Sequence, residues 1–357
     1  MWVHRLNIKN FRNYPALDIS FDKGVNVITG ENGQGKTNLI EAIHFALTGR
    51  SFRTEKTLEM IQKGKEEIAS QVHYDLNAIN NVIQISFGIQ GKKITHNATS
   101  YPSFSSLTGT VPTVAISPSD IELIMGAPVT RRRSLNLLIA QHDPFYAHQL
   151  ARYQKALKAR NVLLKRNSFQ TIKIYEELLA DAGVYIVKAR QKIIQELSEW
   201  IQYHFFELTQ KKLPIVIDYT FKGKADKSYF IEQHEKNRGQ EERVGSTLFG
   251  PHRDDLILFL DSLDAKQYAS EGQKRALLTS WKLSELKLLK NKTGLDPILF
   301  IDDFAIHLDL YRSKLLETVI QNYPQFFLTT PHNIFDDSAL YYVQNATVQK
   351  LSSCTRC

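Results

Sequence analysis

The sequence is poor in cysteine: only Cys354 and Cys357 occur among its 357 residues, and both lie near the C-terminus. Two thiols cannot supply the four ligands of a structural zinc site, and they leave no second pair for a disulfide framework. A chain that needs no disulfides is typical of a reducing compartment. We therefore expect a cytoplasmic protein in which both thiols are reduced.

Long apolar runs are missing as well. No stretch approaches the 18 apolar residues that would suggest a transmembrane helix. The residues after Met1 include no apolar signal-peptide segment, and the chain shows no internal repeat or low-complexity tract. Apolar residues make up 43% and charged residues 23%, which is ordinary for a globular protein. These observations predict a soluble globular protein without a membrane partner.

Acidic residues are outnumbered: 45 Lys and Arg residues against 37 Asp and Glu residues give a formal net charge of +8. A basic balance favours polyanionic partners such as nucleic acid. Between residues 131 and 166, nine Lys or Arg residues stand against a single acid, Asp143, so this segment alone carries +8 (nine minus one). The charge therefore indicates a surface for a polyanion within this segment.

The spacing of apolar residues changes along the chain. Alternation of apolar and polar residues predicts strands within residues 2–29, 68–89 and 111–116. From about Asp143 to residue 207 the apolar residues instead recur every three or four positions, which predicts helices. The later part predicts a strand at 213–221, a loop with some helix at 222–242, a strand at 256–260, a helix at 273–290, and strands at 297–301 and 326–329. A helical arm is thus inserted into a β-rich protein.

The first chemical motif is a phosphate-binding loop at residues 30–37, which matches G-x-x-x-x-G-K-[ST] at every fixed position, between a predicted strand and an apolar helical stretch. Backbone N–H groups of such a loop surround the β-phosphate, and the helix N-terminus adds partial positive charge. Lys36 would reach the β- and γ-phosphate oxygens, and Thr37 would ligate Mg²⁺. The predicted ATP-binding residues are Gly30, Glu31, Asn32, Gly33, Gln34, Gly35, Lys36 and Thr37.

The second half of such a site needs a carboxylate at the end of a buried strand. The apolar run at residues 298–301 ends at Asp302 and Asp303, and ligands gather at the carboxyl ends of strands in open α/β sheets. Asp302 would hold Mg²⁺ together with Thr37, and Asp303 would orient or deprotonate the attacking water. The predicted catalytic residues are therefore Lys36, Asp302 and Asp303.

Lys36 and Asp302 are 266 residues apart in the sequence (302 minus 36). Because both must reach the same nucleotide, the arm has to be an insertion that splits the ATPase domain. We therefore predict an N-terminal ATPase half at residues 1–120, a helical arm lobe at residues 121–241 and a C-terminal ATPase half at residues 242–357.

Residues 270–273 read Ser-Glu-Gly-Gln, which resembles the S-x-G-Q signature of ABC-type ATPases. The acids at 302–303, followed by Leu308 and Asp309, resemble the Walker B motif and D-loop of the same class. In that class the signature of one subunit caps the γ-phosphate held by the other, so two ATP molecules join a homodimer. The residues that the resemblance implies at the cap are Ser270, Gly272 and Gln273.

Four further strings make the chain similar to the RecF family. They lie at residues 10–14, 49–54, 160–165 and 250–255 and read, in order, NFRNY, GRSFRT, RNVLLK and GPHRDD. The similarity covers about residues 1–335 and implies an α/β fold, an ABC/SMC-type P-loop ATPase head with an inserted helical arm lobe. The sequence departs from the usual family pattern at Asn136, at His307 and at residues 329–331.

This resemblance also implies a task. RecF-like proteins bind single-stranded and gapped double-stranded DNA, and with RecO and RecR they help to load RecA during repair. We expect ATP to close the homodimer on DNA and a slow, DNA-stimulated hydrolysis to reopen it. We find no element built to read bases in a groove, so recognition of shape or of a junction is expected.

Two surfaces are candidates for binding DNA. Basic residues on the arm would neutralise phosphates in a salt-dependent manner, or they would instead form a solvated helix face. Arg132 and Arg133 could equally pair with carboxylates of the ATPase lobe. The arm candidates are Arg132, Arg133, Arg152, Lys155 and Lys158. The competing candidates on the ATPase lobe are Lys56, Lys63 and Lys65.

Two polar residues near the predicted site have two interpretations each. Arg12 would either contact the ATP phosphates or be an exposed arginine at a strand end. His332, which follows Pro331, would either sense the γ-phosphate or be an ordinary loop residue.

Three other functions compete with this interpretation. The nucleotide-binding subunit of a transporter is disfavoured by the arm and by the distance between the P-loop and Asp302. An ATPase–nuclease of the overcoming-lysogeny type would need a further domain, and only 54 residues (357 minus 303) follow Asp303. A non-enzymatic DNA clamp would hold ATP without hydrolysing it, which Asp303 disfavours.

Overall fold

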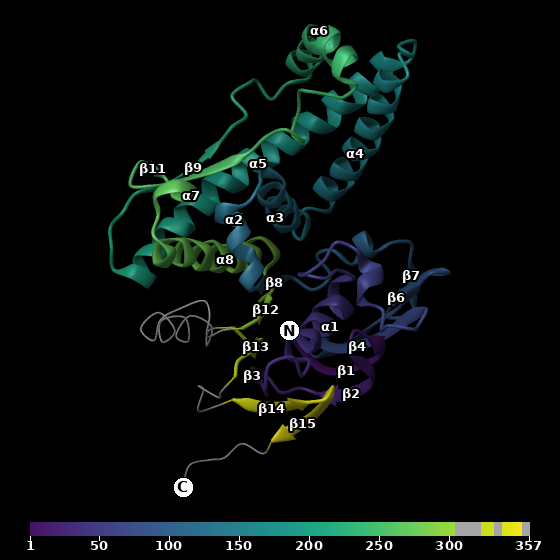
Figure 1. The fold of residues 1–357 in the computed structure, drawn as a ribbon, viewed down its shortest axis with the longest axis vertical. Helices are drawn as coiled ribbons and strands as arrows, with labels where there is room; N and C mark the ends of the chain where they lie inside the picture. Colours follow the sequence, from purple (N-terminus) through teal and green to yellow (C-terminus); the bar gives the residue numbers. More distant parts are fainter. Residues whose placement is uncertain (304–322, 332–337, 352–357) are drawn as a thin grey trace. The chain divides into compact units, whose positions relative to one another are not determined.

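The computed structural model describes residues 1–303, 323–331 and 338–351 (Figure 1). The chain divides into two compact units. Unit 1 comprises residues 1–121, 204–210 and 275–357, and unit 2 comprises residues 122–203 and 211–274. Two long helices, α5 (Ile172–Thr209) and α8 (Glu271–Thr293), contribute residues to both units.

Unit 1 begins with a six-stranded antiparallel sheet. Its strands are β1 (Trp2–Phe11), β2 (Tyr14–Ser20), β4 (Glu67–Leu76), β5 (Ile79–Gly88), β6 (Gly91–His96) and β7 (Thr99–Tyr101), in the order β2-β1-β4-β5-β6-β7. Because successive side chains of a strand point to opposite faces, Leu6 and Ile8 of β1 both point into the core. Both residues of the turns at 77–78 and 97–98 have positive φ, which suits the twist of a tight hairpin.

The second sheet of unit 1 carries the predicted nucleotide-binding motifs. Its strands are β3 (Gly24–Thr29), β8 (Thr113–Ile116), β12 (Ile298–Ile301), β13 (Gln325–Thr329), β14 (Ala339–Gln344) and β15 (Thr347–Leu351), in the order β15-β14-β3-β13-β12-β8. All neighbours pair in parallel except β14 and β15. Residues of β12 and β13 are buried throughout, as is usual for central parallel strands. The carboxyl ends of β3, β12 and β13 therefore share one edge.

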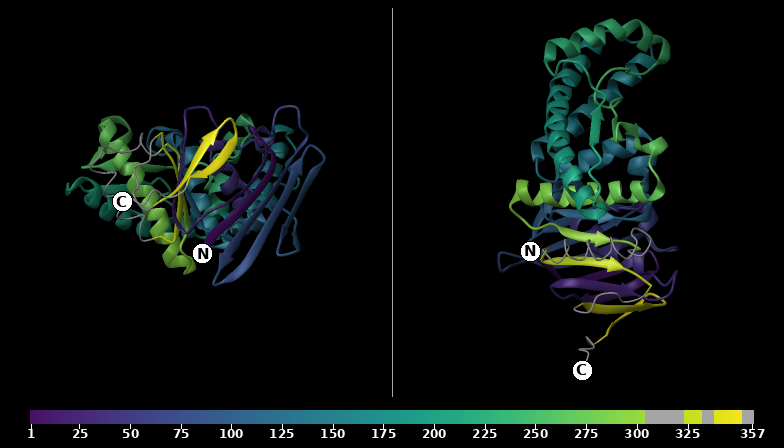
Figure 2. Two further views of the ribbon diagram at one scale, coloured as in Figure 1. Left: turned by 90° about the horizontal axis from the view of Figure 1, so that it is seen from below. Right: turned by 90° about the vertical axis from the view of Figure 1, so that its left-hand side faces the viewer.

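Helix α1 (Lys36–Thr48) contacts both sheets of unit 1, whose purple, blue and yellow strands are seen from two further sides in Figure 2. It contacts β1, β4 and β5 of the antiparallel sheet and β13 of the parallel sheet. Leu39 and Ile43 of α1 share one core with Ile8, Phe300 and Phe327 from the strands. Short 3-10 helices complete the unit: η1 (Thr57–Met60), η2 (Phe104–Leu107) and η3 (Pro118–Ile121).

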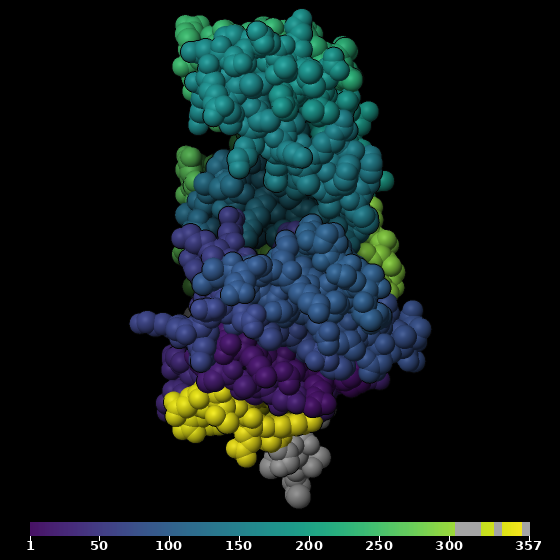
Figure 3. All heavy atoms as spheres, turned by 90° about the vertical axis from the view of Figure 1, so that its right-hand side faces the viewer, coloured from purple at the N-terminus to yellow at the C-terminus, as the bar shows by residue number. Residues whose placement is uncertain are grey.

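The β14–β15 hairpin packs against the N-terminal strands of unit 1. Strand β15 contacts β2, and the Tyr341 hydroxyl donates to the Ser20 carbonyl oxygen at 3.2 Å. Lys350 forms an ion pair with Asp22 at 2.7 Å. Figure 3 shows the hairpin in yellow beside the purple N-terminal residues. The last described strands thus stabilise the first ones.

Unit 2 combines helices with a small antiparallel sheet of order β11-β10-β9. Besides most of α5, it contains α2 (Glu122–Met125), α3 (Pro128–Ala140), α4 (Pro144–Lys165), β9 (Ile215–Tyr219), α6 (Lys227–Val244), β10 (Leu256–Leu260), β11 (Leu263–Asp264) and α7 (Ala265–Tyr268). Helix α4 begins at an N-cap, because the Asp143 carboxylate accepts from the Tyr146 N–H at 2.9 Å.

Residues 222–242 were predicted as a loop with some helix, but the structure has the helix α6 over most of this segment. Few of its residues are apolar, so it has little hydrophobic periodicity for the sequence to display. Its ends are nevertheless marked: the Asp226 carboxylate caps the first turn, and Gly245 ends the helix in a left-handed conformation with φ 69°.

A buried ion network holds the helices of unit 2 together. Arg160 of α4 has a fully buried side chain that contacts Glu176 of α5 at 2.8 Å and Glu241 of α6 at 2.6 Å. Arg131 of α3 binds Asp255 through two hydrogen bonds of 2.8 Å. Both arginines were counted among the nine basic residues at 131–166. Because their charges are paired inside the protein, seven basic residues (nine minus two) of that segment remain as candidates for the polyanion surface.

The second predicted domain boundary differs from the observed division. Residues 242–274 were assigned to the C-terminal ATPase half, but they belong to unit 2. The reason is strand pairing, because β10 pairs with β9 along its whole length, and Arg131 holds Asp255. The first predicted boundary, after residue 120, lies one residue from the observed one.

Candidate functional site

The P-loop at residues 30–37 joins β3 to α1, and its glycines adopt conformations that other residues avoid. Gly30, Gly33 and Gly35 have φ angles of 142°, 81° and 117°. A Cβ on Gly30 would lie 2.3 Å from the Val343 carbonyl oxygen, and a Cβ on Gly35 would lie 2.7 Å from Nδ2 of Asn13. Glycine is required at Gly30 by its φ angle and also by the close approach of β14.

Gly30→Ala is expected to lower the melting temperature more than Gly33→Ala does. Both substitutions place a side chain at positive φ, which costs about 1–3 kcal/mol. Only Gly30→Ala also drives a methyl group into the backbone of Val343, because no atom lies within 4 Å of a Cβ at Gly33. Thermal unfolding of the two variants measures the difference, and equal melting temperatures would contradict the role assigned to β14.

The P-loop is supported from two sides. On one side, the Tyr14 hydroxyl donates to the Gly35 carbonyl oxygen at 3.1 Å, and Asn13 donates to the Gln34 carbonyl oxygen at 3.2 Å. On the other side, the Asn345 N–H donates to Oε1 of Gln34 at 2.7 Å. The predicted nucleotide ligand Gln34 thus fastens the loop to the β14–β15 turn.

Lys36 bends back over the loop at the first turn of α1. Its ammonium donates to the carbonyl oxygens of Gly30 at 2.7 Å and Glu31 at 2.9 Å. Partial burial lowers the pKa of Lys36, while the nearby carboxylates of Asp303 and Asp302 act in the opposite direction. The ammonium is therefore held at the mouth of the loop, where a phosphate would lie.

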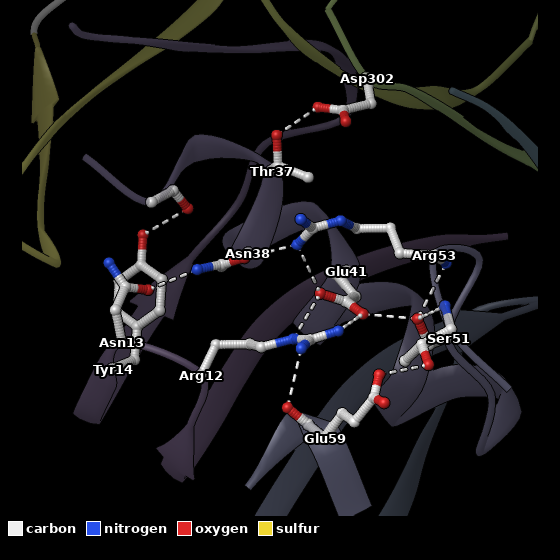
Figure 4. Close-up of polar contacts among 12 residues, drawn as sticks. Arg12, Asn13, Tyr14, Thr37, Asn38, Glu41, Ser51, Arg53, Glu59 and Asp302 are labelled. Atoms are coloured by element: carbon white, nitrogen blue, oxygen red, sulfur yellow. Dashed lines mark hydrogen bonds and ion pairs between the residues drawn. The ribbon is translucent and has the colours of Figure 1, made fainter. Parts of the chain in front are cut away.

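The predicted magnesium ligands meet across 265 residues of sequence. The Thr37 hydroxyl donates to Oδ1 of Asp302 at 2.7 Å (Figure 4), and the Thr329 hydroxyl donates to the same oxygen at 2.9 Å. Burial raises the pKa of Asp302, and these two hydroxyls oppose that shift. A hydroxyl and a carboxylate oxygen side by side form a hard donor set that fits Mg²⁺.

Asp303 lies beside this pair and faces the same cavity. Its backbone N–H donates to the Thr329 hydroxyl at 2.7 Å, and its φ angle of 54° is in the left-handed region. The cavity has a volume of about 260 Å³. Its lining residues are Asn32, Gly33, Gly35, Lys36, Thr37, Asn38, Arg53, Asp303, Thr329 and Pro331. Three residues that the sequence proposed for the site, Lys36, Thr37 and Asp303, thus line this cavity.

Three residues around the cavity were missed by sequence reasoning: Asn38, Glu41 and Arg53. Arg53 donates from Nη1 to Asn38 at 2.8 Å and to Glu41 at 3.2 Å (Figure 4). Arg12, for which two roles were considered, binds the Glu41 carboxylate through both Nε and Nη2. The strings at 10–14 and 49–54 were the available signal, but they indicated a family without indicating this contact.

The signature residues lie in unit 2 at the start of α8. The Ser270 hydroxyl accepts from the Gln273 N–H at 3.3 Å, and Oε1 of Gln273 accepts from the Ser270 N–H at 2.8 Å. This reciprocal arrangement is a capping box. Ser270 is exposed and Gly272 is half-buried.

The arm candidates for DNA binding differ in their surroundings. Lys155 and Lys158 of α4 and Arg133 of α3 are exposed. Arg132 is half-buried and donates to the Asp254 carbonyl oxygen at 2.6 Å, whereas Arg152 lies 3.9 Å from an Asp181 carboxylate oxygen. The printed contact of Arg132 is therefore with a backbone carbonyl of unit 2 and not with a carboxylate of the ATPase lobe, whereas Arg152 lies near a carboxylate of unit 2.

Several residues that the sequence singled out lie outside the described part of the chain. These are His307, Leu308, Asp309, His332, Cys354 and Cys357. Within the described residues, no helix combines the length and the apolar character needed to cross a bilayer.

Comparison with known proteins agrees with this architecture. The family model described as "RecF/RecN/SMC N terminal domain" matches residues 2–350. The chain is 36% identical to the protein named "DNA replication and repair protein RecF" of Halalkalibacterium halodurans, over 98% of this chain and 100% of that protein. It is 37% identical to the protein of the same name from Streptococcus uberis, over 92% and 93% of the two chains.

Solved structures lead to the same family. The structure described as "the recombination mediator protein RecF-ATP in RecFOR pathway" has a TM-score of 0.91 and 30% identity over 98% of both chains. An SMC head bound to the C-terminal winged-helix domain of ScpA matches with a TM-score of 0.57 and 14% identity, over 100% of this chain and 99% of that chain, which shows the fold alone. With an ABC/SMC-type α/β head, a complete P-loop and relatives over its whole length, the chain belongs to the RecF family.

Proposed function

We propose that this chain is an ATPase that binds ATP and Mg²⁺ in the P-loop cavity and uses ATP to close a homodimer on DNA. The observation that carries the proposal is the contact between Thr37 and Asp302, 2.7 Å apart in space and 265 residues apart in sequence. It joins a phosphate-binding loop to a buried strand-end carboxylate, which is the arrangement that P-loop ATPases need.

Each residue at the cavity has a separate task. The P-loop N–H groups and the Lys36 ammonium bind the β- and γ-phosphates, while Thr37 and Asp302 hold Mg²⁺. The metal would neutralise charge on the transferred phosphoryl group when it is bound. Asp303 faces the cavity from the adjacent position, where it orients the attacking water and accepts its proton.

The dimer is proposed from the exposed signature. Ser270 is exposed at the N-terminus of α8, and its hydroxyl and the partial positive charge of the helix end suit a phosphate oxygen supplied by another subunit. In this arrangement each ATP contacts the P-loop of one subunit and Ser270, Gly272 and Gln273 of the other. Hydrolysis then removes the shared γ-phosphate and reopens the dimer.

The biological task follows from the relatives. Proteins named for DNA replication and repair, and a recombination mediator of the RecFOR pathway, resemble this chain over nearly its full length. We propose that it recognises gapped or single-strand/double-strand junction DNA in the cytoplasm. With RecO and RecR it would promote RecA loading, and its hydrolysis would be slow and DNA-stimulated.

The direct test is sedimentation with and without ATP, Mg²⁺ and gapped DNA. The protein should sediment as a monomer without nucleotide and as a dimer with ATP. A monomer under saturating ATP and Mg²⁺, even with gapped DNA, would refute the proposed function.

Replacing two exposed lysines of α4 should weaken DNA binding. Lys155→Glu combined with Lys158→Glu removes two cations that project from the helix, and it should flatten the dependence of affinity on salt concentration. Fluorescence anisotropy with gapped DNA at several salt concentrations measures both effects. Lys63→Glu with Lys65→Glu is the matched comparison on unit 1, and a larger loss there would move the DNA surface to the ATPase lobe.

A further inference from the structure

Glu41 is a charged residue buried within α1. Its side chain is 0% exposed, and its carboxylate accepts from Arg12 at 3.0 and 2.8 Å and from Arg53 at 3.2 Å. The Ser51 hydroxyl donates to Oε1 at 2.5 Å. Four hydrogen bonds thus converge on one carboxylate beside the nucleotide cavity (Figure 4).

The charges of this cluster do not balance. Arg12 and Arg53 carry two positive charges against the single negative charge of Glu41. The Glu59 carboxylate accepts from the Thr54 hydroxyl at 2.7 Å and lies 3.5 Å from Lys56, and Arg12 contacts Glu59 through its backbone carbonyl oxygen. Glu41 therefore leaves one positive charge unmatched. Burial raises the pKa of Asp302 and Arg53 is among the groups that oppose this rise, so the Asp302 carboxylate shares in that charge.

That charge belongs to Arg53. Arg12 uses two nitrogens on the Glu41 carboxylate, and its side chain is only 19% exposed. Arg53 reaches Glu41 through Nη1 alone, shares that nitrogen with Asn38, and is 41% exposed. Arg53 also lines the cavity that contains Lys36 and Thr37. The incompletely neutralised guanidinium thus lies where phosphates would bind.

Glu41 is also linked to Arg53 indirectly, through the Ser51 hydroxyl and the backbone N–H of Arg53. The Ser51 oxygen accepts from the backbone N–H groups of Arg53 at 2.9 Å and Thr54 at 3.0 Å. A hydroxyl has one proton, and the Ser51 proton is directed at Glu41. The carboxylate therefore orients the hydroxyl, and the hydroxyl orders the turn from which Arg53 projects.

We propose that Glu41 is a positioning residue that aims the Arg53 guanidinium at the phosphates of the bound nucleotide. This inference rests on the proposed function, in which the cavity holds ATP. Glu41 does not line the cavity itself, so its influence passes through Arg53. Loss of its charge should raise KM for ATP and leave kcat nearly unchanged, because Lys36, Thr37 and Asp303 keep their places.

A double-mutant cycle tests this pathway. Glu41→Gln and Arg53→Ala should each weaken ATP binding about tenfold, the loss of one charge-assisted hydrogen bond. The double variant should bind ATP no more weakly than Arg53→Ala alone, because Glu41 then has nothing to position. Isothermal titration calorimetry with ATP and Mg²⁺ measures all four proteins, and steady-state kinetics separate KM from kcat.

Ser51→Ala provides a second route if Glu41→Gln does not fold. It removes only the hydroxyl, and its effect should likewise disappear in the Arg53→Ala background. Glu66→Gln, an exposed carboxylate of unit 1, is the matched control and should bind ATP as the unmodified protein does.

The outcomes separate this inference from the proposed function. Additive effects in the cycle, or unchanged ATP affinity in folded Glu41→Gln, would overturn the role of Glu41 while ATP binding and dimerisation of the unmodified protein stand. If the unmodified protein itself fails to bind ATP, both proposals are wrong.

Discussion

Asp303→Asn is expected to lower the rate of ATP hydrolysis by about 100-fold or more, the usual contribution of a positioned general base. The amide cannot accept the proton of the attacking water, but it keeps nearly the same shape. ATP affinity should change little, since the P-loop, Lys36 and Thr37 are untouched. Turnover measured under saturating ATP with and without DNA gives the result.

The backbone conformation at residue 303 should not be disturbed by this substitution. Asp303 has φ 54°, and asparagine is one of the few residues that tolerate the left-handed region. Asp261→Asn is a matched control, because Asp261 has φ 51° in an exposed turn of unit 2. Unchanged hydrolysis in Asp303→Asn would show that Asp303 is not the base and would favour a clamp that merely holds ATP.

Ser270→Arg is expected to abolish ATP-induced dimerisation while each subunit still binds ATP. Ser270 is exposed at the N-terminus of α8, where the proposed cap on the γ-phosphate has room for a hydroxyl and none for a long cationic side chain. The P-loop lies in unit 1 and keeps its own contacts. Light scattering with ATP and Mg²⁺ measures the dimer, and calorimetry measures ATP binding.

A loss of helix stability in Ser270→Arg must be distinguished from a loss of the dimer interface. Ser270 also caps α8 through Gln273, so its replacement costs about 1 kcal/mol of helix stability. Ser168→Arg introduces the same side chain at an exposed serine of unit 2 and should leave the dimer intact. A dimer that persists in Ser270→Arg would mean that the signature does not contribute to a composite site.

The sequence predicted those parts of the molecule whose physics is local. The P-loop follows from glycines at fixed spacing, and the position of Asp302 follows from an apolar run that ends in acids. The contact between Thr37 and Asp302 was also expected, because one nucleotide requires both. In each case the residue types alone carry the chemistry.

Sequence reasoning failed for long-range pairs that no motif marks. The pairing of β9 with β10 moves residues 242–274 into unit 2, and no local pattern records that choice. Arg160 was counted among the basic residues of the arm, and its burial could not be foreseen because its acidic partners, Glu176 and Glu241, lie on other helices. Glu41 was hidden for the same reason, since its partners come from the turn between β1 and β2 and from the turn at 51–54.

The order of strands in the parallel sheet has a consequence for biosynthesis on the ribosome. Strand β3 is complete at Thr29, but its neighbours β13 and β14 begin at Gln325 and Ala339. At about 5–20 residues per second, roughly 15–60 s pass before either edge of β3 can be paired. The nascent chain therefore carries β3 without its native neighbours for almost the whole of translation, and an unpaired strand of this kind is a template for wrong pairing and aggregation.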